Sequence, residues 1–169
     1  MKIALAYAMA GEIESLLTAT GAKLLETVHG VPFYEIEKDI IAYAGGIGKV
    51  NAAVCTQVLI DHFGVDYIIN TGCAGAIHPE LGIGDILIST DAVQHDMDVS
   101  ALGDPIGTIP RLAESYFKAD EMLVKLAQEA AAETAETAET AENYHVILGR
   151  VASGDKFIGT KEGKEHIKR

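Results

Sequence analysis

Short apolar segments alternate with amphipathic ones along most of the chain. Apolar or alternating runs bounded by turn residues predict strands, and apolar residues spaced three and four apart predict helices. We predict strands at 2–8, 39–46, 66–72, 84–93 and 144–154, with an antiparallel pair at 23–30 and 31–38. We predict helices at about 11–20, at 48–64 with Gly64 as the C-cap, from about 119 and from 160.

This order of elements determines the expected fold. Strands that alternate with helices, together with an early antiparallel pair, predict an α/β fold with a mixed central sheet flanked by helices. A length of 169 residues fits a single domain, residues 1–169. Residues 94–118 carry no periodicity and predict a long loop containing Pro105 and Pro110, and loops of that length are usually functional or disordered.

One segment, ETAETAETAE at 133–142, repeats every three residues. This period does not match a helix, so Glu133, Glu136, Glu139 and Glu142 would wind around its surface and repel one another weakly. We interpret the segment as a solvated helix end without chemistry.

Composition and charge exclude several classes of partner. The chain is 49% apolar and 22% charged, as expected of a soluble globular protein. A net charge of −12 disfavours nucleic acid and anionic membrane surfaces. Cys55 and Cys73 form no metal-binding or disulfide pattern, which favours a reducing, cytoplasmic location. No segment approaches the roughly 18 apolar residues of a membrane span.

The first residues, MKIALAYAMAGE, allow two interpretations. A basic start and a short apolar run outline a secretory signal. The same residues are typical of a first buried strand followed directly by a helix. We favour the strand because the rest of the chain has cytoplasmic features.

Two glycine clusters, GGIGK (45–49) and NTGCAGA (70–76), each follow a predicted strand. Such turns present backbone N–H groups at the carboxyl edge of a sheet, where open α/β sheets bind ligands. The first cluster is not a Walker A loop, because Tyr43 and Val50 occupy its glycine and hydroxyl positions; Asn51 breaks the dinucleotide fingerprint. Taken alone, the clusters could be ligand-binding turns or purely structural ones.

A cluster of polar residues lies in the long loop. His95, Asp96 and Asp98 are residue types that bind metals, but no further ligand at a suitable spacing accompanies them. We therefore predict a hydrogen-bonded loop, no metal site and no cofactor.

Four ordered stretches carry a resemblance to a known family. AMAGEIESLL (8–17), GGIGKVNAA (45–53) with INTGCAGAI (69–77), HDMDVSALG (95–103) and SGDKFI (153–158) resemble the 5′-methylthioadenosine/S-adenosylhomocysteine nucleosidases in order and spacing. The resemblance implies a nucleoside phosphorylase-like fold, a homodimer, and cleavage by water of the bond between adenine N9 and ribose C1′. Adenine and a 5′-thioribose would be the products.

The resemblance also assigns a role to Glu12, which matches the water-activating carboxylate of the family. Its place at the end of an apolar strand is expected to desolvate it partly, as suits a general base. Without the resemblance, Glu12 would be a solvated acid in a first helical turn. We expect Glu14 to lie on the surface.

Further residues match the family's pocket. Phe157 matches the aromatic that stacks on adenine, although a core aromatic is the alternative, and Ile158 matches the position whose backbone pairs with the adenine edge. By the same resemblance the substrate-binding residues include Ile47, Cys73, Ala74 and Gly75, whereas Leu102 and Pro110 would reach the partner subunit's substrate. Loop packing is the alternative for these last two, and Cys73 stands where family members often carry serine.

The end of the chain departs from the family. Members continue into a strand, a Glu-Met-Glu segment that binds the ribose and a Ser-Asp pair that supplies the general acid, and no residue here matches them. We therefore expect a truncated chain, which reading the coding sequence beyond codon 169 would test.

Two other functions stay open. A phosphorylase would need arginine clamps, yet the chain has only Arg111, Arg150 and Arg169, and Asn70 stands where those enzymes carry arginine. A non-catalytic nucleoside-binding fragment is the second. Among substrates, the residues do not rank methylthioadenosine, adenosylhomocysteine, deoxyadenosine and futalosine-type nucleosides.

Overall fold

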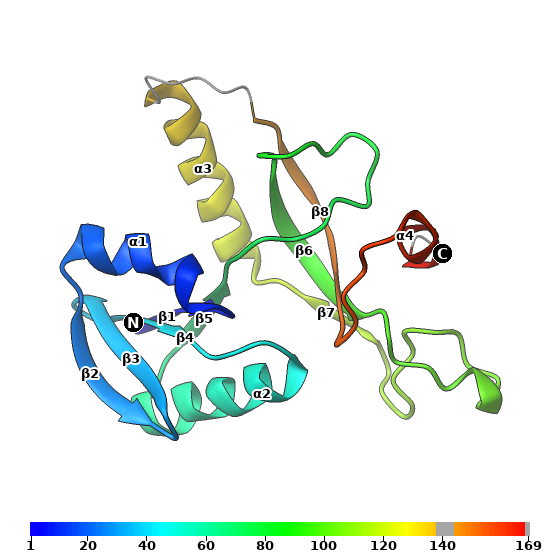
Figure 1. The fold of residues 1–169 in the computed structure, drawn as a ribbon, viewed down its shortest axis with the longest axis horizontal. Helices are drawn as coiled ribbons and strands as arrows, with labels where there is room; N and C mark the ends of the chain where they lie inside the picture. Colours follow the sequence, from blue (N-terminus) through cyan, green and yellow to red (C-terminus); the bar gives the residue numbers. More distant parts are fainter. Residues whose placement is uncertain (138–143, 168–169) are drawn as a thin grey trace. The chain divides into compact units, whose positions relative to one another are not determined.

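The computed structural model describes residues 1–137 and 144–167, and the chain divides into two compact units, Met1–Ala74 and Gly75–Arg169. Each unit contains its own sheet (Figure 1). The prediction of one domain over residues 1–169 stays a prediction. Within the predicted glutamate stripe, Glu133 is exposed, whereas Glu139 and Glu142 lie outside the described residues.

The first unit contains a five-stranded mixed sheet in the order β2-β3-β4-β1-β5. Strand β1 runs parallel to β4 and β5, whereas β2, β3 and β4 are antiparallel neighbours. The elements are β1 (Ile3–Tyr7), α1 (Ala10–Thr20), β2 (Lys23–Val28), β3 (Val31–Glu37), β4 (Ile40–Ala44), α2 (Lys49–Val58), the π-helical turn η1 (Leu59–Phe63) and β5 (Tyr67–Asn70). Every strand and helix predicted in this region is confirmed, including the left-handed C-cap Gly64.

A hydrophobic cluster of this unit lies on one face of the sheet. Alternation in β1 places Ala4 and Ala6 on the same face, where both are buried. The fully buried Phe33 stacks on Tyr43 with ring centroids 5.1 Å apart and lies 4.8 Å from Phe63. Cys55 and Leu59 of α2 and η1 complete this cluster. Helix α1 lies on the opposite side of the sheet from α2 (Figure 1).

Helix α2 buries a narrower face than its apolar content indicates. Cys55 is 3% exposed, whereas Val50 and Val54 are 75% and 50% exposed. Because one face of a helix spans only part of its circumference, apolar residues at all three positions cannot share the same buried side.

The second unit contains a three-stranded sheet in the order β7-β6-β8, with β6 parallel to β8 and antiparallel to β7. Helix α3 contacts β6. The elements are β6 (Ile86–Gln94), the 3-10 turn η2 (Ser100–Leu102), β7 (Tyr116–Lys118), α3 (Glu121–Thr137), β8 (Val146–Ser153) and α4 (Lys161–Ile167). The predicted loop at 94–118 is therefore interrupted by η2 and β7, each too short to show a period.

Three aspartates fasten β6 to β8. Asp85 accepts a backbone hydrogen bond from His145, Asp91 binds Arg150 with both carboxylate oxygens, and Asp96 accepts from the backbone N–H of Asp155. The sequence separations are 60, 59 and 59 residues, because the register shifts by one between Ser89 and Asp91. The extra residue at this β-bulge is Thr90.

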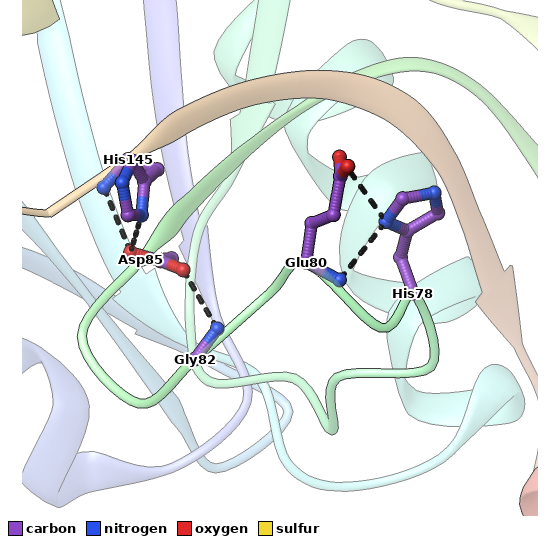
Figure 2. Close-up of polar contacts among 5 residues, drawn as sticks. All are labelled: His78, Glu80, Gly82, Asp85 and His145. Carbon is purple, nitrogen blue, oxygen red and sulfur yellow. Dashed lines mark hydrogen bonds and ion pairs between the residues drawn. The ribbon is translucent and has the colours of Figure 1, made fainter.

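Asp85 joins the loop before β6 to the start of β8 (Figure 2). Its side chain is 6% exposed, and its Oδ2 accepts from the Gly82 N–H at 2.6 Å. Its Oδ1 accepts from the His145 N–H at 2.7 Å and lies 3.3 Å from Nδ1 of the same residue. These N–H groups, Gly82 first and then His145, bind the charged form and so lower the pKa of Asp85 below its ordinary value.

This contact predicts an acid-sensitive stability. A carboxyl group whose pKa is lowered by folding stabilises the protein above its ordinary pKa, and that stability is lost as the pH falls through the folded value. We expect Asp85→Asn to lower the melting temperature at about pH 7, with a difference from wild type that shrinks below about pH 4.

Melting curves measured across this pH range, with Glu80→Gln as the control, check the prediction. Glu80 belongs to the same loop, but its side chain is largely exposed and its Oε2 lies 4.0 Å from Nδ1 of His78 (Figure 2). Its replacement should therefore have little effect at any pH. A deficit in Asp85→Asn that is independent of pH would contradict the proposed cause.

Candidate functional site

The carboxyl ends of β1, β4 and β5 meet at one edge of the first sheet. The N–H of Gly45 donates to the Tyr7 carbonyl at 2.9 Å, and that of Gly46 to the Ala8 carbonyl at 3.0 Å. From the other side, the N–H of Thr71 donates to the Ala6 carbonyl at 3.0 Å. The two glycine turns therefore flank the turn that follows β1, in the position where parallel sheets bind ligands.

Glu12 lies in this turn at the start of α1 and is half-buried, whereas Glu14 is exposed, as expected. Its Oε2 accepts hydrogen bonds from the backbone N–H groups of Ala8 at 3.1 Å and Met9 at 2.9 Å. The carboxylate thus satisfies donors at the helix start, where the helix dipole also favours a negative charge.

The other oxygen of Glu12 lies close to the turn after β5. A Cβ at Gly72 would stand 3.1 Å from Oε1, and Gly72 has a φ of +155°, which L side chains rarely adopt. Glycine at this position therefore permits the turn to approach the carboxylate. Backbone from the β5 turn and a carboxylate from the β1 turn are brought together here, as the motifs predict.

The first glycine cluster is required for packing. A Cβ at Gly45 would lie 2.7 Å from Cε2 of Tyr43 and 2.9 Å from the Cys55 sulfur. Gly46 has a φ of +95° and lies against the side chain of Asn51, whose Nδ2 donates to the Ile47 carbonyl at 2.7 Å. Gly45 therefore has a packing role, while the turn also presents Ile47, which is 73% exposed.

Tyr7 lies near Glu12 and was not among the residues predicted for the site. Burial, and then the nearby charge of Glu12, raise the pKa of its phenol. Since Ala6 faces the core, alternation places Tyr7 on the side of the sheet that α1 covers. The alternation of residues 2–8, together with the motif AMAGEIESLL that follows, could have indicated Tyr7 in the sequence.

The remaining predicted residues are mostly exposed. In the first unit, Cys73 and Ala74 follow Gly72 as exposed residues. In the second unit, Gly75 and Pro110 are exposed, Leu102 is 80% exposed and Phe157 is 99% exposed. The alternative of a core aromatic is therefore wrong for Phe157.

Ile158 is half-buried, with its side chain close to Gly163 of α4. The polar group in the loop after β6 makes hydrogen bonds, as predicted. Asp96 accepts from the Asp155 N–H at 2.8 Å, and Asp98 accepts from the Ser100 N–H at 3.0 Å. Across residues 1–137 and 144–167, no group of three or more His, Cys, Asp or Glu is placed to hold a metal ion. No helix in the described part of the chain has the length and apolarity needed to cross a membrane.

A hollow of about 390 Å³ lies at the opposite end of the first sheet, where Lys2 precedes β1 and Asp39 precedes β4. Nε2 of His62 and Oε2 of Glu26 lie 2.7 Å apart, within hydrogen-bond distance, in its wall. Because Glu12 follows the carboxyl end of β1, this hollow is separate from the glycine turns.

Comparison with known proteins defines the class of this chain. The family model described as the phosphorylase superfamily matches residues 2–169. Together with the mixed α/β fold and the glycine turns at its strand ends, this match places the chain in the phosphorylase superfamily.

Individual relatives define the family. A 5′-methylthioadenosine/S-adenosylhomocysteine nucleosidase from Bacillus pumilus (strain SAFR-032) is 43% identical over 162 residues, which are 94% of this chain and 66% of the relative. The structure of such a nucleosidase from Neisseria meningitidis in complex with methylthio-immucillin-A has a TM-score of 0.86 and 36% identity, covering 99% of this chain and 70% of that one. The structure of a futalosine hydrolase mutant from Helicobacter pylori strain 26695 has a TM-score of 0.84 and 34% identity, covering 98% of this chain and 70% of that one.

The chain therefore belongs to the 5′-methylthioadenosine/S-adenosylhomocysteine nucleosidase family, and it spans about two thirds of the length of the Bacillus pumilus relative. The predicted family and the nucleoside phosphorylase-like fold are confirmed.

The contact between Gly72 and Glu12 predicts the effect of a methyl group. We expect Gly72→Ala to lower the free energy of unfolding by more than about 1 kcal/mol, because the backbone is strained for alanine and the new methyl group crowds Oε1 of Glu12. Urea unfolding measures the loss. Gly75→Ala is the matched control, since a Cβ there meets nothing within 4 Å. Equal stabilities of the two variants would contradict the proposed crowding.

Proposed function

We propose that this protein hydrolyses the N-glycosidic bond of adenine nucleosides that carry a 5′-thioether, releasing adenine and a 5′-thioribose. The observation that carries the proposal is the position of Glu12, with Oε2 bound to the Ala8 and Met9 N–H groups and Oε1 beside Gly72, in a chain of this family. The relatives' names supply the substrate class.

Glu12 acts as the general base in this proposal. The N–H groups on Oε2 hold the carboxylate in one orientation, so that Oε1 can accept a proton from a water molecule. The water oxygen attacks ribose C1′ while the C1′–N9 bond breaks, and the purine leaves with the bonding electrons. A proton from solvent neutralises the departing purine, and Glu12 releases to solvent the proton that it took from the water. Because the transition state resembles an oxocarbenium ion, a carboxylate near the sugar also stabilises its positive charge.

Phe157 is assigned to the purine. Its almost complete exposure leaves a ring face available for stacking, worth about 0.5–1.5 kcal/mol beyond burial of its area. The Ile158 backbone would pair with the adenine edge, and Ile47, Cys73, Ala74 and Gly75 would line the pocket.

A homodimer is part of the proposal. Leu102 and Pro110 would contact the substrate of the partner subunit, and the 80% exposure of Leu102 supports an apolar surface available for that contact. We assign the protein to the cytoplasm on its composition and on the pattern of its cysteines.

Among substrates, we favour methylthioadenosine and adenosylhomocysteine over a futalosine-type nucleoside. The Bacillus pumilus relative and the Neisseria meningitidis structure are both named as nucleosidases of these two thioethers.

Water is favoured over phosphate as the second substrate. Arg150, one of three arginines, is bound to Asp91 and stacks 3.8 Å from the ring centroid of Tyr116, so its guanidinium is already engaged. Asn70, at the end of β5, carries no charge to attract an anion.

Adenine release should therefore be equally fast with and without inorganic phosphate. Chromatography of adenine from methylthioadenosine measures both rates in the same buffer at constant ionic strength. Strict dependence on phosphate would establish a phosphorylase in place of a hydrolase.

We expect Glu12→Gln to slow adenine release by about 10²- to 10⁴-fold, the usual contribution of a positioned acid or base. The amide oxygen of glutamine can still accept from Ala8 and Met9, so the turn should keep its structure. Glu14→Gln is the control, because Glu14 lies two residues away on the surface and should retain the wild-type rate.

Initial rates of adenine release with these three proteins test the role of Glu12. Equal rates in wild type and Glu12→Gln would eliminate it as the base. Binding of methylthioadenosine without release of adenine in any of them would favour the non-catalytic nucleoside-binding alternative.

A further inference from the structure

The chain leaves β8 through a tightly fixed turn. The N–H of His95 donates to the carbonyl of Ser153, the last residue of β8, at 3.0 Å. Two residues later, the N–H of Asp155 donates to Oδ2 of Asp96 at 2.8 Å. A backbone contact and a carboxylate from the end of β6 therefore hold both sides of Gly154.

Gly154 itself lies directly against this carboxylate and its neighbour. A Cβ at this position would lie 2.5 Å from Nε2 of His95 and 2.8 Å from Cγ of Asp96. These distances are shorter than any normal contact, so only glycine allows the turn and the two side chains to occupy these positions together.

The other end of the segment is fixed by α4. A Cβ at Gly163 would lie 3.1 Å from Cγ2 of Ile158, which places that side chain close to the helix backbone. The hydroxyl of Thr160 accepts from the Gly163 N–H at 3.1 Å and caps the helix.

Phe157 lies between these two fixed points and is 99% exposed. A side chain that buries so little of its surface gains little positional restraint from packing. Its position therefore depends on the backbone on either side of it, and thus on the Asp96 contact upstream and the α4 contact downstream.

We propose that Asp96 is a positioning residue of the purine-binding segment, residues 153–158. By holding the backbone of Asp155 beside Gly154, it sets where Phe157 and Ile158 meet the base. This inference rests on the proposed function, because it assigns Asp96 to the same site. Asp96 acts through the backbone and makes no contact with substrate in this role, so its loss should weaken binding of the purine more than it slows bond cleavage.

The test compares Asp96→Ala and Asp96→Asn with wild type in the whole protein. Asp120→Ala is the matched control, since Asp120, like Asp96, accepts hydrogen bonds from the backbone, in its case from the N–H groups of Met122 and Leu123 at the start of α3. Both alanine variants thus lose backbone N–H contacts to a carboxylate, but only one contact adjoins the purine-binding segment. Phe157→Ala gives the effect of removing the aromatic ring itself.

Two readouts are measured. Amide hydrogen exchange of the peptide containing Asp155 reports the contact independently of any activity. Adenine binding by calorimetry, with KM and kcat for methylthioadenosine, reports its functional consequence. We expect faster exchange in Asp96→Ala, a Kd for adenine and a KM raised about tenfold, as for loss of one charged hydrogen bond, and a kcat changed less than about threefold.

Asp96→Asn keeps an acceptor oxygen and should restore most of the affinity, while Asp120→Ala should leave Kd and KM unchanged. Unchanged exchange at Asp155 in Asp96→Ala would overturn the inference, as would faster exchange with wild-type Kd and KM. A wild-type protein that neither binds adenine nor cleaves methylthioadenosine would overturn the proposed function and this inference with it, whereas the exchange readout would still show whether Asp96 fastens the turn.

Discussion

The hydrogen bonds from Ala8 and Met9 to Glu12 are the interaction on which the candidate site depends. A half-buried carboxylate is tolerated only when donors compensate for its lost hydration, and the first turn of a helix provides backbone donors that need an acceptor. The same contact starts α1 and orients the side chain toward Gly72. The requirement of the fold and the requirement of the proposed chemistry are met by one residue.

The second unit uses the same chemistry for a different purpose. Asp85 and Asp96 each accept a backbone N–H beside an end of β8, one before its first residue and the other after its last. A parallel pair of strands has no tight turn to join its ends, so side chains at the strand ends take over part of that task. Asp91 and Arg150 add a contact near the middle.

Most of the fold could be predicted from the sequence, because the strands of the first unit are bounded by clear turn residues and the burial of β1 alternates along the strand. Ala4 and Ala6 show this alternation directly. The short β7 and the turn η2 could not be predicted, since three residues carry no measurable period. For α2 the pattern indicated a helix but not which apolar residues it would bury, because that depends on the tertiary contact with the sheet.

For the site, the motifs were informative at Glu12 and Gly72. Glycine at position 72 lets the backbone after β5 approach the carboxylate of Glu12 closely. Tyr7 was missed because in the sequence it is one more residue of an apolar strand; its relation to Glu12 follows only when the alternation of β1 is read together with the helix start that comes after it. The role of Gly154 was also hidden, since the side chains that exclude a Cβ there are about 59 residues earlier in the chain.

The bulge at Thr90 has a consequence for how β6 and β8 can be assembled. Asp85 matches its partner at a separation of 60 residues, while the two aspartates after the bulge match at 59. A slip of β8 by one position would separate all three carboxylates from their partners, and removing the extra residue would let only one side of the bulge match at a time. The three contacts therefore favour one alignment of the strand pair, with the bulge in place, in which Asp85, Asp91 and Asp96 all meet their partners.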